Sequence, residues 1–163
     1  MDSYLNSTQL KNAVESLTPY YKKGAIRKLI EDPISWDQII NSAGKKNRLL
    51  EGGMVQQDPV VPGCIKLLRD KLLKLYTPRT NDATVHVYCS FSKDAETYGK
   101  HKDTANVWFI GAIGQTVFDI EGQTYNIGPG DAMFIPRSVY HTPIPMGARA
   151  GFSIGLEHGR HDY

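Results

Sequence analysis

Two histidines and one aspartate in the second half of the chain have the types and spacing of metal ligands. His101 and Asp103 stand two positions apart. On a strand, side chains so spaced point to the same face, which in a small barrel can be the interior. With His141 as a third donor, they leave three octahedral positions open, an arrangement typical of non-haem Fe(II) oxygenases. Zinc sites with an open position use similar ligands, so the residue types alone do not name the metal.

The sequence before His141 favours this metal site over an ordinary surface pair. An isolated His-x-Asp is more often two neighbouring side chains on a protein surface. Here, however, the turn sequence Gly-Pro-Gly-Asp at 128–131 leads into an apolar run, Met-Phe-Ile-Pro at 133–136, and then to His141. A tight turn that feeds a strand can deliver the histidine inward, beside His101 and Asp103.

Alternating polarity from residue 83 onward predicts the strands that position these three residues. Val85, Val87 and Cys89 alternate with His86 and Tyr88, which is the period of a half-buried strand. Short runs of β character follow, with turn residues between them, at 105–112, 116–120, 123–127, 132–135, 139–144 and 149–156. Many short, evenly spaced strands predict an antiparallel barrel or sandwich.

Helical spacing dominates the chain before residue 80. Residues 8–17 place apolar side chains three and four positions apart behind Ser7, a candidate cap. Ser35 is a suitable N-cap for a second short helix that begins with Trp36. Leucines and an isoleucine among basic residues predict a third helix, Cys64–Tyr76. The expected fold class is therefore mainly β with N-terminal helices.

Length and composition indicate one globular domain, with a helical lead-in at 1–80 and a β core at 83–157. The 163 residues are 40% hydrophobic and 22% charged, as in ordinary soluble proteins. The net charge of +2 is too small to indicate nucleic acid or an anionic membrane as an obligatory partner. Because neither a secretory signal nor a run of 18 apolar residues is found, we expect a cytoplasmic protein. Cys64 and Cys89 lack CxxC spacing, which predicts reduced, buried thiols.

Residues 83–157 resemble the double-stranded β-helix, or cupin, core of the JmjC-type Fe(II)- and 2-oxoglutarate-dependent oxygenases. The chain is most similar to the ribosomal-protein hydroxylases and the asparaginyl hydroxylases of that family. The resemblance rests on the segments 98–109, 127–141 and 151–155, together with Gly114. It implies that His101, Asp103 and His141 bind Fe(II), and that 2-oxoglutarate and O2 are cosubstrates. It further implies hydroxylation of a substrate, either a protein side chain or a small molecule.

The sequence departs from the family at the residue that anchors 2-oxoglutarate. The family has a lysine about 13 residues after the aspartate, and Thr116 stands there. A dianion in a dry pocket needs a charge-assisted partner, ideally an arginine. Arg149, eight residues after His141, occupies a position from which other branches of the superfamily supply that arginine. The alternative for Arg149 is a surface salt bridge.

Several polar side chains are candidates to complete the cosubstrate site. Hydroxyl groups of Tyr88, Tyr98, Thr116 and Ser153 are expected to donate to the same carboxylate. Asn106, three residues after Asp103, either faces the keto acid or is a structural amide in a strand turn. Trp108 and Phe109 are predicted to belong to the core and the barrel wall.

Two further departures concern the substrate. Gly111 replaces a glutamine of the family, which predicts open space near the metal and a different substrate. The sequence stops at Tyr163, so the helical dimerisation and winged-helix domains of the ribosomal hydroxylases are expected to be absent; oligomeric state is left open. Two alternative functions remain: a cupin metalloenzyme that does not use 2-oxoglutarate, such as a direct dioxygenase or isomerase, and a non-catalytic cupin binding module.

Overall fold

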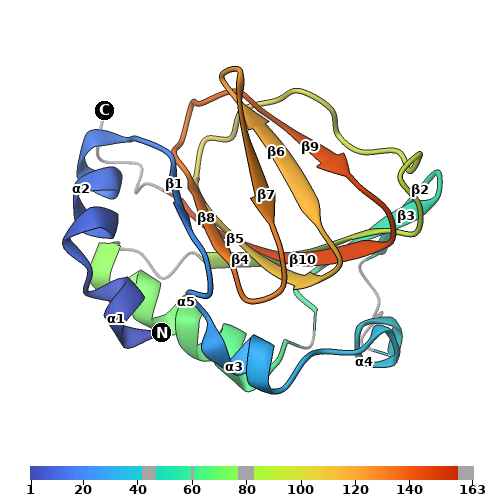
Figure 1. Cartoon of the computed structure of the whole chain (residues 1–163), viewed down its shortest axis with the longest axis horizontal. Coiled ribbons are helices and arrows are strands. Elements are labelled where there is room, and N and C mark those ends of the chain that lie inside the picture. The colour runs from blue at the N-terminus through green and yellow to red at the C-terminus, as the bar shows by residue number, and fades with distance from the viewer. Residues whose placement is uncertain (42–46, 60, 77–82, 158–163) are drawn as a thin grey trace.

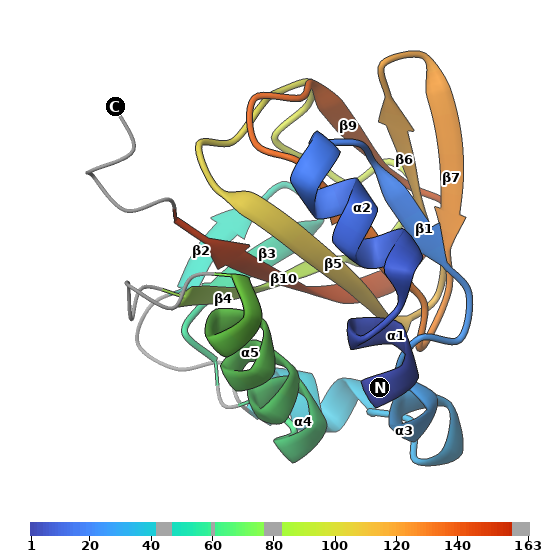
Figure 2. The ribbon, with the colours of Figure 1, turned by 90° about the vertical axis from the view of Figure 1, so that its left-hand side faces the viewer.

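Two antiparallel β-sheets pack face to face, and helices cover the outer side of the larger sheet (Figures 1 and 2). The structure is a computed structural model that describes residues 1–41, 47–59, 61–76 and 83–157. This arrangement confirms the expected fold class, a mainly β double-stranded β-helix of the cupin or jelly-roll kind with N-terminal helices. None of the helices within these ranges is long and apolar enough to cross a membrane.

The larger sheet is built from seven strands of the described chain. They are β1 (Tyr20–Lys22), β2 (Asn47–Leu50), β3 (Gly53–Gln57), β4 (Ala83–Ser90), β5 (Asn106–Ile113), β8 (Ala132–Ile135) and β10 (Arg149–Leu156). Their order across the sheet is β1-β8-β5-β10-β4-β3-β2. The smaller sheet consists of β6 (Thr116–Ile120), β7 (Gln123–Ile127) and β9 (His141–Pro145), in the order β7-β6-β9.

Five helices precede the β core in the described part of the chain. They are α1 (Asp2–Leu5), α2 (Thr8–Ser16), α3 (Arg27–Glu31), α4 (Trp36–Asn41) and α5 (Gly63–Tyr76). The Ser7 hydroxyl caps α2 by accepting from Leu10 N at 3.2 Å. Ser35 and Gln38 form a reciprocal capping box at the start of α4, with bonds of 3.2 and 2.8 Å. The predicted caps therefore act as expected, and α5 packs its Ile65, Leu68 and Leu72 inward.

The central strands of the larger sheet separate two apolar clusters. On β4, Val85 and Val87 face the helices, and β10 and β5 turn Phe152 and Trp108 to the same side. Between the sheets lies a second cluster, to which the larger sheet contributes Val107, Phe109, Met133 and Ile135, and the smaller sheet Phe118, Ile120 and Ile127. Successive residues of one strand thus serve opposite faces, as the pleat of a strand requires.

A buried aspartate fixes the turn that leads into β8. The Asp131 carboxylate accepts from the Tyr21 hydroxyl at 2.9 Å, from Gly24 N at 2.9 Å and from Gly128 N at 2.8 Å. Gly130 adopts φ 81°, a backbone conformation that favours glycine. The turn at 128–131 is thereby tied to the segment around β1, which sets where β8 and then β9 begin.

The structure contains elements that the sequence pattern did not predict. Strands β1, β2 and β3 extend the larger sheet at both edges, and α1 and α3 add helical turns to the lead-in. These elements are short, and their residues acquire strand or helix geometry from neighbours that are distant in sequence. Both cysteines are free, as expected; Cys89 is buried, whereas Cys64 is partly exposed.

Candidate metal centre

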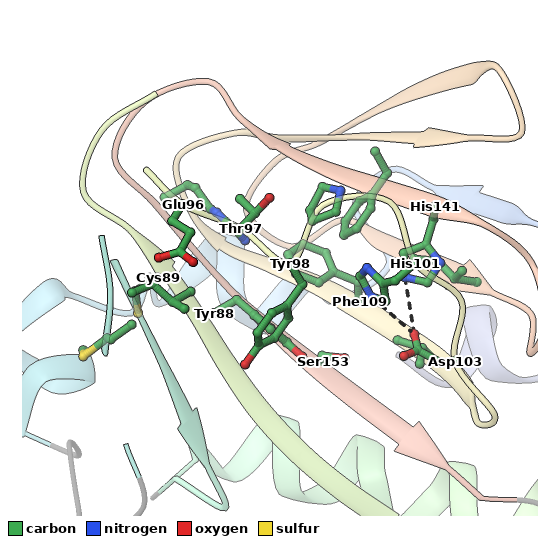
Figure 3. Close-up of a pocket in the computed structure, with 17 residues that line it drawn as sticks. Tyr88, Cys89, Glu96, Thr97, Tyr98, His101, Asp103, Phe109, His141 and Ser153 are labelled. Carbon is green, nitrogen blue, oxygen red and sulfur yellow. Dashed lines mark ion pairs between the residues drawn. The ribbon is translucent and has the colours of Figure 1, made fainter. Parts of the chain in front are cut away.

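The side chains of His101, Asp103 and His141 converge at one point between the two sheets (Figure 3). Asp103 Oδ2 lies 3.3 Å from His141 Nε2 and 3.9 Å from His101 Nε2. One ligand atom from each residue can be chosen so that all three lie within 4.8 Å of one another. The fold therefore brings together three donors from segments about 40 residues apart, in a group that could hold a metal ion.

Main-chain hydrogen bonds, rather than a regular strand, hold the two histidines side by side. His101 N donates to His141 O at 3.0 Å, and His141 N donates to His101 O at 2.8 Å. His141 begins β9. The His-x-Asp spacing had predicted a strand for His101 and Asp103, but both residues belong to the irregular segment before β5. Ser138 N donates to Asp103 O at 2.8 Å and fixes the far end of that segment.

Both imidazoles are oriented for coordination through Nε2. His101 Nδ1 lies 2.8 Å from Gly99 O, and His141 Nδ1 lies 3.0 Å from Val139 O. A carbonyl oxygen only accepts, so each Nδ1 carries the proton and donates it to the main chain. In neutral imidazoles this leaves the Nε2 lone pairs directed at the common point, which is the usual way a metal-binding histidine is prepared.

A proton or a metal ion between His141 and Asp103 would stabilise the arrangement of these two side chains. When His141 is neutral, its Nε2 lone pair and the Asp103 carboxylate face each other at 3.3 Å, and they repel unless a proton or a metal ion lies between them. The hydrogen bond and the charge of a protonated His141 would lower the pKa of the Asp103 carboxyl, against the opposing effect of burial. Asp103 and His101 are 38% and 31% exposed, so the centre is open to solvent on one side.

A cavity with about 40 Å³ of space open to the centre of a water molecule runs inward from these three residues. Arg149 lines it and is only 3% exposed. Its Nε donates to the hydroxyl of Ser90 at 2.9 Å. Ser90 is the residue of β4 that pairs with Arg149 across the sheet. Burial lowers the pKa of Arg149 to about 10, so the guanidinium remains charged at neutral pH. Within the described ranges, no carboxylate forms an ion pair with this arginine.

The structure places three of the other predicted residues around the same cavity. Tyr88, Tyr98 and Ser153 all line it, and Tyr98 meets the His101 ring edge-on, with 6.3 Å between the ring centroids (Figure 3). Burial raises the pKa of Tyr88 to about 12, which keeps its hydroxyl protonated as a donor.

Two predicted residues do not line the cavity. Asn106 accepts from Arg137 N at 2.9 Å and shares its strand face with Trp108, on the helix side of the sheet. Of the two roles expected for Asn106, the structure therefore supports the structural amide and not a contact with the keto acid. Thr116 is buried on β6, two residues before Phe118, but only Phe118 reaches the cavity.

The open space expected at Gly111 is absent. A Cβ atom at this position would lie 2.0 Å from Gly128 O, because the turn at 128–131 packs directly on the strand. Gly111 N donates to Asp131 O, and Gly130 N donates to Gly111 O. Gly111 therefore permits the backbone of β5 to pack closely against the turn at 128–131. The prediction that it opens space for a substrate is wrong.

Part of the cavity wall comes from residues that the sequence did not single out. Leu50 and Met54 come from the hairpin of β2 and β3, and Glu96 and Thr97 from the segment that follows β4. Glu96 N donates to Glu51 O at 2.7 Å, which ties that segment to the hairpin. The sequence Glu51-Gly52-Gly53 between two apolar stretches is a hairpin signal that could have identified this wall.

Solved structures with a similar fold include a ribosomal oxygenase from Escherichia coli, YcfD. Its complex with cobalt and succinic acid matches with a TM-score of 0.70 at 15% identity, over 95% of this chain and 53% of that one. Its complex with cobalt and 2-oxoglutarate gives 0.68 at 16% identity, over 95% and 53%. This chain therefore spans about half the length of that oxygenase. No protein-family model and no curated protein matches the sequence. At this identity the likeness establishes the double-stranded β-helix fold.

Proposed function

We propose that the protein is an Fe(II)- and 2-oxoglutarate-dependent oxygenase that hydroxylates a protein side chain or a small molecule. One observation carries the proposal: a buried arginine, to which no carboxylate in the described part of the chain is paired, lines the same cavity as a two-histidine, one-carboxylate centre. A buried charge is costly unless it is paired. A dicarboxylate that spans the cavity would pair with Arg149 at one end and chelate a metal at the other.

The three ligand residues suit Fe(II). His101 and His141 offer Nε2 atoms and Asp103 a carboxylate oxygen, the donor set of the oxygenase centres with open positions. A bound Fe(II) ion supplies the activation of O2, with conversion of 2-oxoglutarate to succinate and CO2 and transfer of one oxygen atom to the substrate. The chain's own residues bind and orient the reactants and exclude water.

Arg149 is suited to hold the distal carboxylate. Its Nε is engaged by Ser90, which fixes the guanidinium plane and leaves the two terminal nitrogens for a bidentate, charge-assisted contact. Tyr88 and Ser153 hydroxyls line the cavity and can add hydrogen bonds to the cosubstrate. Val107, Phe109, Phe118 and Ile135 form apolar walls, which strengthen these contacts by keeping the site dry.

The comparison with YcfD agrees with this proposal. The E. coli oxygenase has been solved with cobalt and 2-oxoglutarate and with cobalt and succinic acid, which are a metal with the keto acid and with its decarboxylated product. Its description as a ribosomal oxygenase makes a protein side chain our first candidate substrate class, with a small molecule as the second.

Anaerobic titration tests the proposal directly. The protein is loaded with Fe(II) and then titrated with 2-oxoglutarate, and we expect the weak visible charge-transfer band of a chelated keto acid. Arg149→Met should abolish the band or weaken 2-oxoglutarate affinity by more than tenfold, because a charge-assisted contact is lost. Arg69→Met provides a matched control, since Arg69 lies on α5 and pairs with Asp70 on the surface.

The two alternative functions predict other outcomes of the same titration. Iron binding without a keto-acid band would favour a cupin metalloenzyme that does not use 2-oxoglutarate. The observation in favour of that alternative is Thr116, which stands in place of the family lysine and does not reach the cavity. Failure to bind iron would favour a non-catalytic binding module and overturn the proposal.

A further inference from the structure

An aromatic ring lies between the two ends of the cavity, where the carbon chain of a cosubstrate would run. The interior face of β10 presents, in order, Arg149, Gly151 and Ser153. From Arg149 to Ser153 the strand covers about 14 Å, four residues at about 3.4 Å each. Ser153 stands opposite Phe109 of β5, whose ring leans back over Gly151.

The absence of a side chain at Gly151 creates the space in which the Phe109 ring lies. A Cβ atom at Gly151 would lie 2.1 Å from Phe109 Cζ, well inside contact distance. The other side of the ring is held by Phe118, edge to face with 4.8 Å between centroids, and Phe118 in turn lies 6.2 Å from the His141 ring. Phe109 is 2% exposed, and Gly151 and Phe118 hold its ring in place at the edge of the cavity.

We propose that Phe109 determines which chain length of dicarboxylic 2-oxo acid the site accepts. This inference rests on the proposed function, because it assumes that one end of the acid chelates the metal and the other pairs with Arg149. Both ends are then fixed: the two histidines by their backbone bridge, the Asp103 segment by the bond from Ser138 N, and the guanidinium by Ser90. A longer acid has to accommodate an extra methylene by bending, and the Phe109 ring occupies the space into which it would bend.

The wall opposite this ring supports the assignment. Tyr88 lies on β4 directly across from Gly151, so the carbon chain of the acid would pass between the Tyr88 side chain and the Phe109 ring. Tyr88 is itself packed edge-on against Tyr98, with 6.0 Å between ring centroids. The channel therefore has firm aromatic groups on both sides, and truncation of Phe109 is the change that widens it without touching Arg149 or the ligand residues.

The test compares two keto acids that differ by one methylene. Protein loaded with Fe(II) under anaerobic conditions is titrated with 2-oxoglutarate and with its six-carbon homologue 2-oxoadipate, and dissociation constants are read from the charge-transfer band and by calorimetry. We expect the unaltered protein to prefer 2-oxoglutarate by at least about tenfold, the usual worth of one misplaced methylene in a fitted pocket. In Phe109→Leu this ratio should fall to about one, through tighter binding of 2-oxoadipate.

Two controls separate chain-length selection from a general loss of packing. Phe134→Leu truncates a fully buried phenylalanine of β8 that faces the helices and does not line the cavity, so it should leave the ratio unchanged. The five-carbon monocarboxylic acid 2-oxopentanoate lacks the distal carboxylate, and it should bind weakly to both the unaltered protein and Phe109→Leu.

The outcomes distinguish this inference from the function on which it rests. If the unaltered protein binds 2-oxoglutarate and the selectivity ratio is the same in Phe109→Leu, the role of Phe109 is overturned while the oxygenase proposal stands. An equal change of the ratio in Phe134→Leu would also overturn it. If neither keto acid binds the unaltered, iron-loaded protein, both proposals fail together.

Discussion

The two faces of the larger sheet differ in what they contact, although the same strands build both: one packs against the helices, and the other lines the cavity. On β10, Phe152 points to the helices and is 1% exposed, whereas its neighbours Gly151 and Ser153 lie on the inner face, where Ser153 lines the cavity. The helix-facing side is mainly an apolar cluster, with Asn106 and Gln56 as buried polar exceptions, and the inner side holds an arginine and tyrosines beside a glycine. The larger apolar cluster therefore lies on one face, and the other face combines a smaller apolar cluster with the polar groups of the candidate site.

Truncation on the helix-facing side should have the largest effect on stability. Phe152→Ala removes a fully buried ring, and we expect the free energy of unfolding to fall by about 3–5 kcal/mol in urea denaturation. The neighbouring change Ser153→Ala, on the cavity side, should alter it by less than about 0.5 kcal/mol. If both variants lost the same free energy of unfolding, the two faces would contribute equally to stability, and the comparison would be wrong.

Replacement of the buried charge should leave stability intact or increase it. Arg149→Met combined with Ser90→Ala replaces the buried guanidinium and its hydroxyl acceptor with apolar groups of similar volume. We expect the free energy of unfolding to rise by about 1–2 kcal/mol while 2-oxoglutarate binding is lost. A clear loss of stability, measured by the same denaturation, would mean that Arg149 is a structural residue.

Loss of a cap in the helical layer should lower stability without affecting the metal centre. Ser7→Ala removes the acceptor for Leu10 N at the start of α2, which should cost about 1 kcal/mol. Metal affinity, followed by calorimetry, should stay within twofold of the unaltered value. A changed affinity would show that the lead-in and the centre are energetically coupled.

A cavity-side histidine should produce a small acid sensitivity. Burial lowers the pKa of His86 below its usual 6.5, despite the opposing charges of Asp58 and Asp103. The unfolded chain therefore binds a proton more readily than the folded one, and the stability due to His86 is present above pH 6.5 and lost as the pH falls through the lower, folded pKa. His86→Gln should flatten this part of a plot of unfolding free energy against pH. An unchanged slope in the metal-free protein would contradict it.

Local pattern predicted the β core well because its strands alternate clearly. The runs at 83–91, 116–120, 123–127 and 132–135 correspond closely to β4, β6, β7 and β8. The edge strands β1 and β2 were missed because they have only three or four residues and depend on pairing partners that are distant in sequence.

The grouping of the three donor residues was also predictable, but their immediate setting was not. The spacing of His101 and Asp103 predicted a strand. In the structure, two main-chain hydrogen bonds between His101 and His141 hold the histidines side by side instead. Gly111 was misread because its role depends on the backbone of Gly128, 17 residues away. The two alternatives for Asn106 stayed open in the sequence, since a shift of one residue along β5 decides whether a side chain faces the cavity or the helices; the structure gives it the structural role.

The bridge between His101 and His141 also bears on how such a centre can change over evolutionary time. Both of its hydrogen bonds join main-chain atoms, so the two positions stay side by side whatever side chains they carry, proline excepted. Substitutions there would exchange the donor atoms while this backbone contact remains. A single residue change at either position would therefore alter the donor set of the candidate centre while the backbone around it keeps its arrangement.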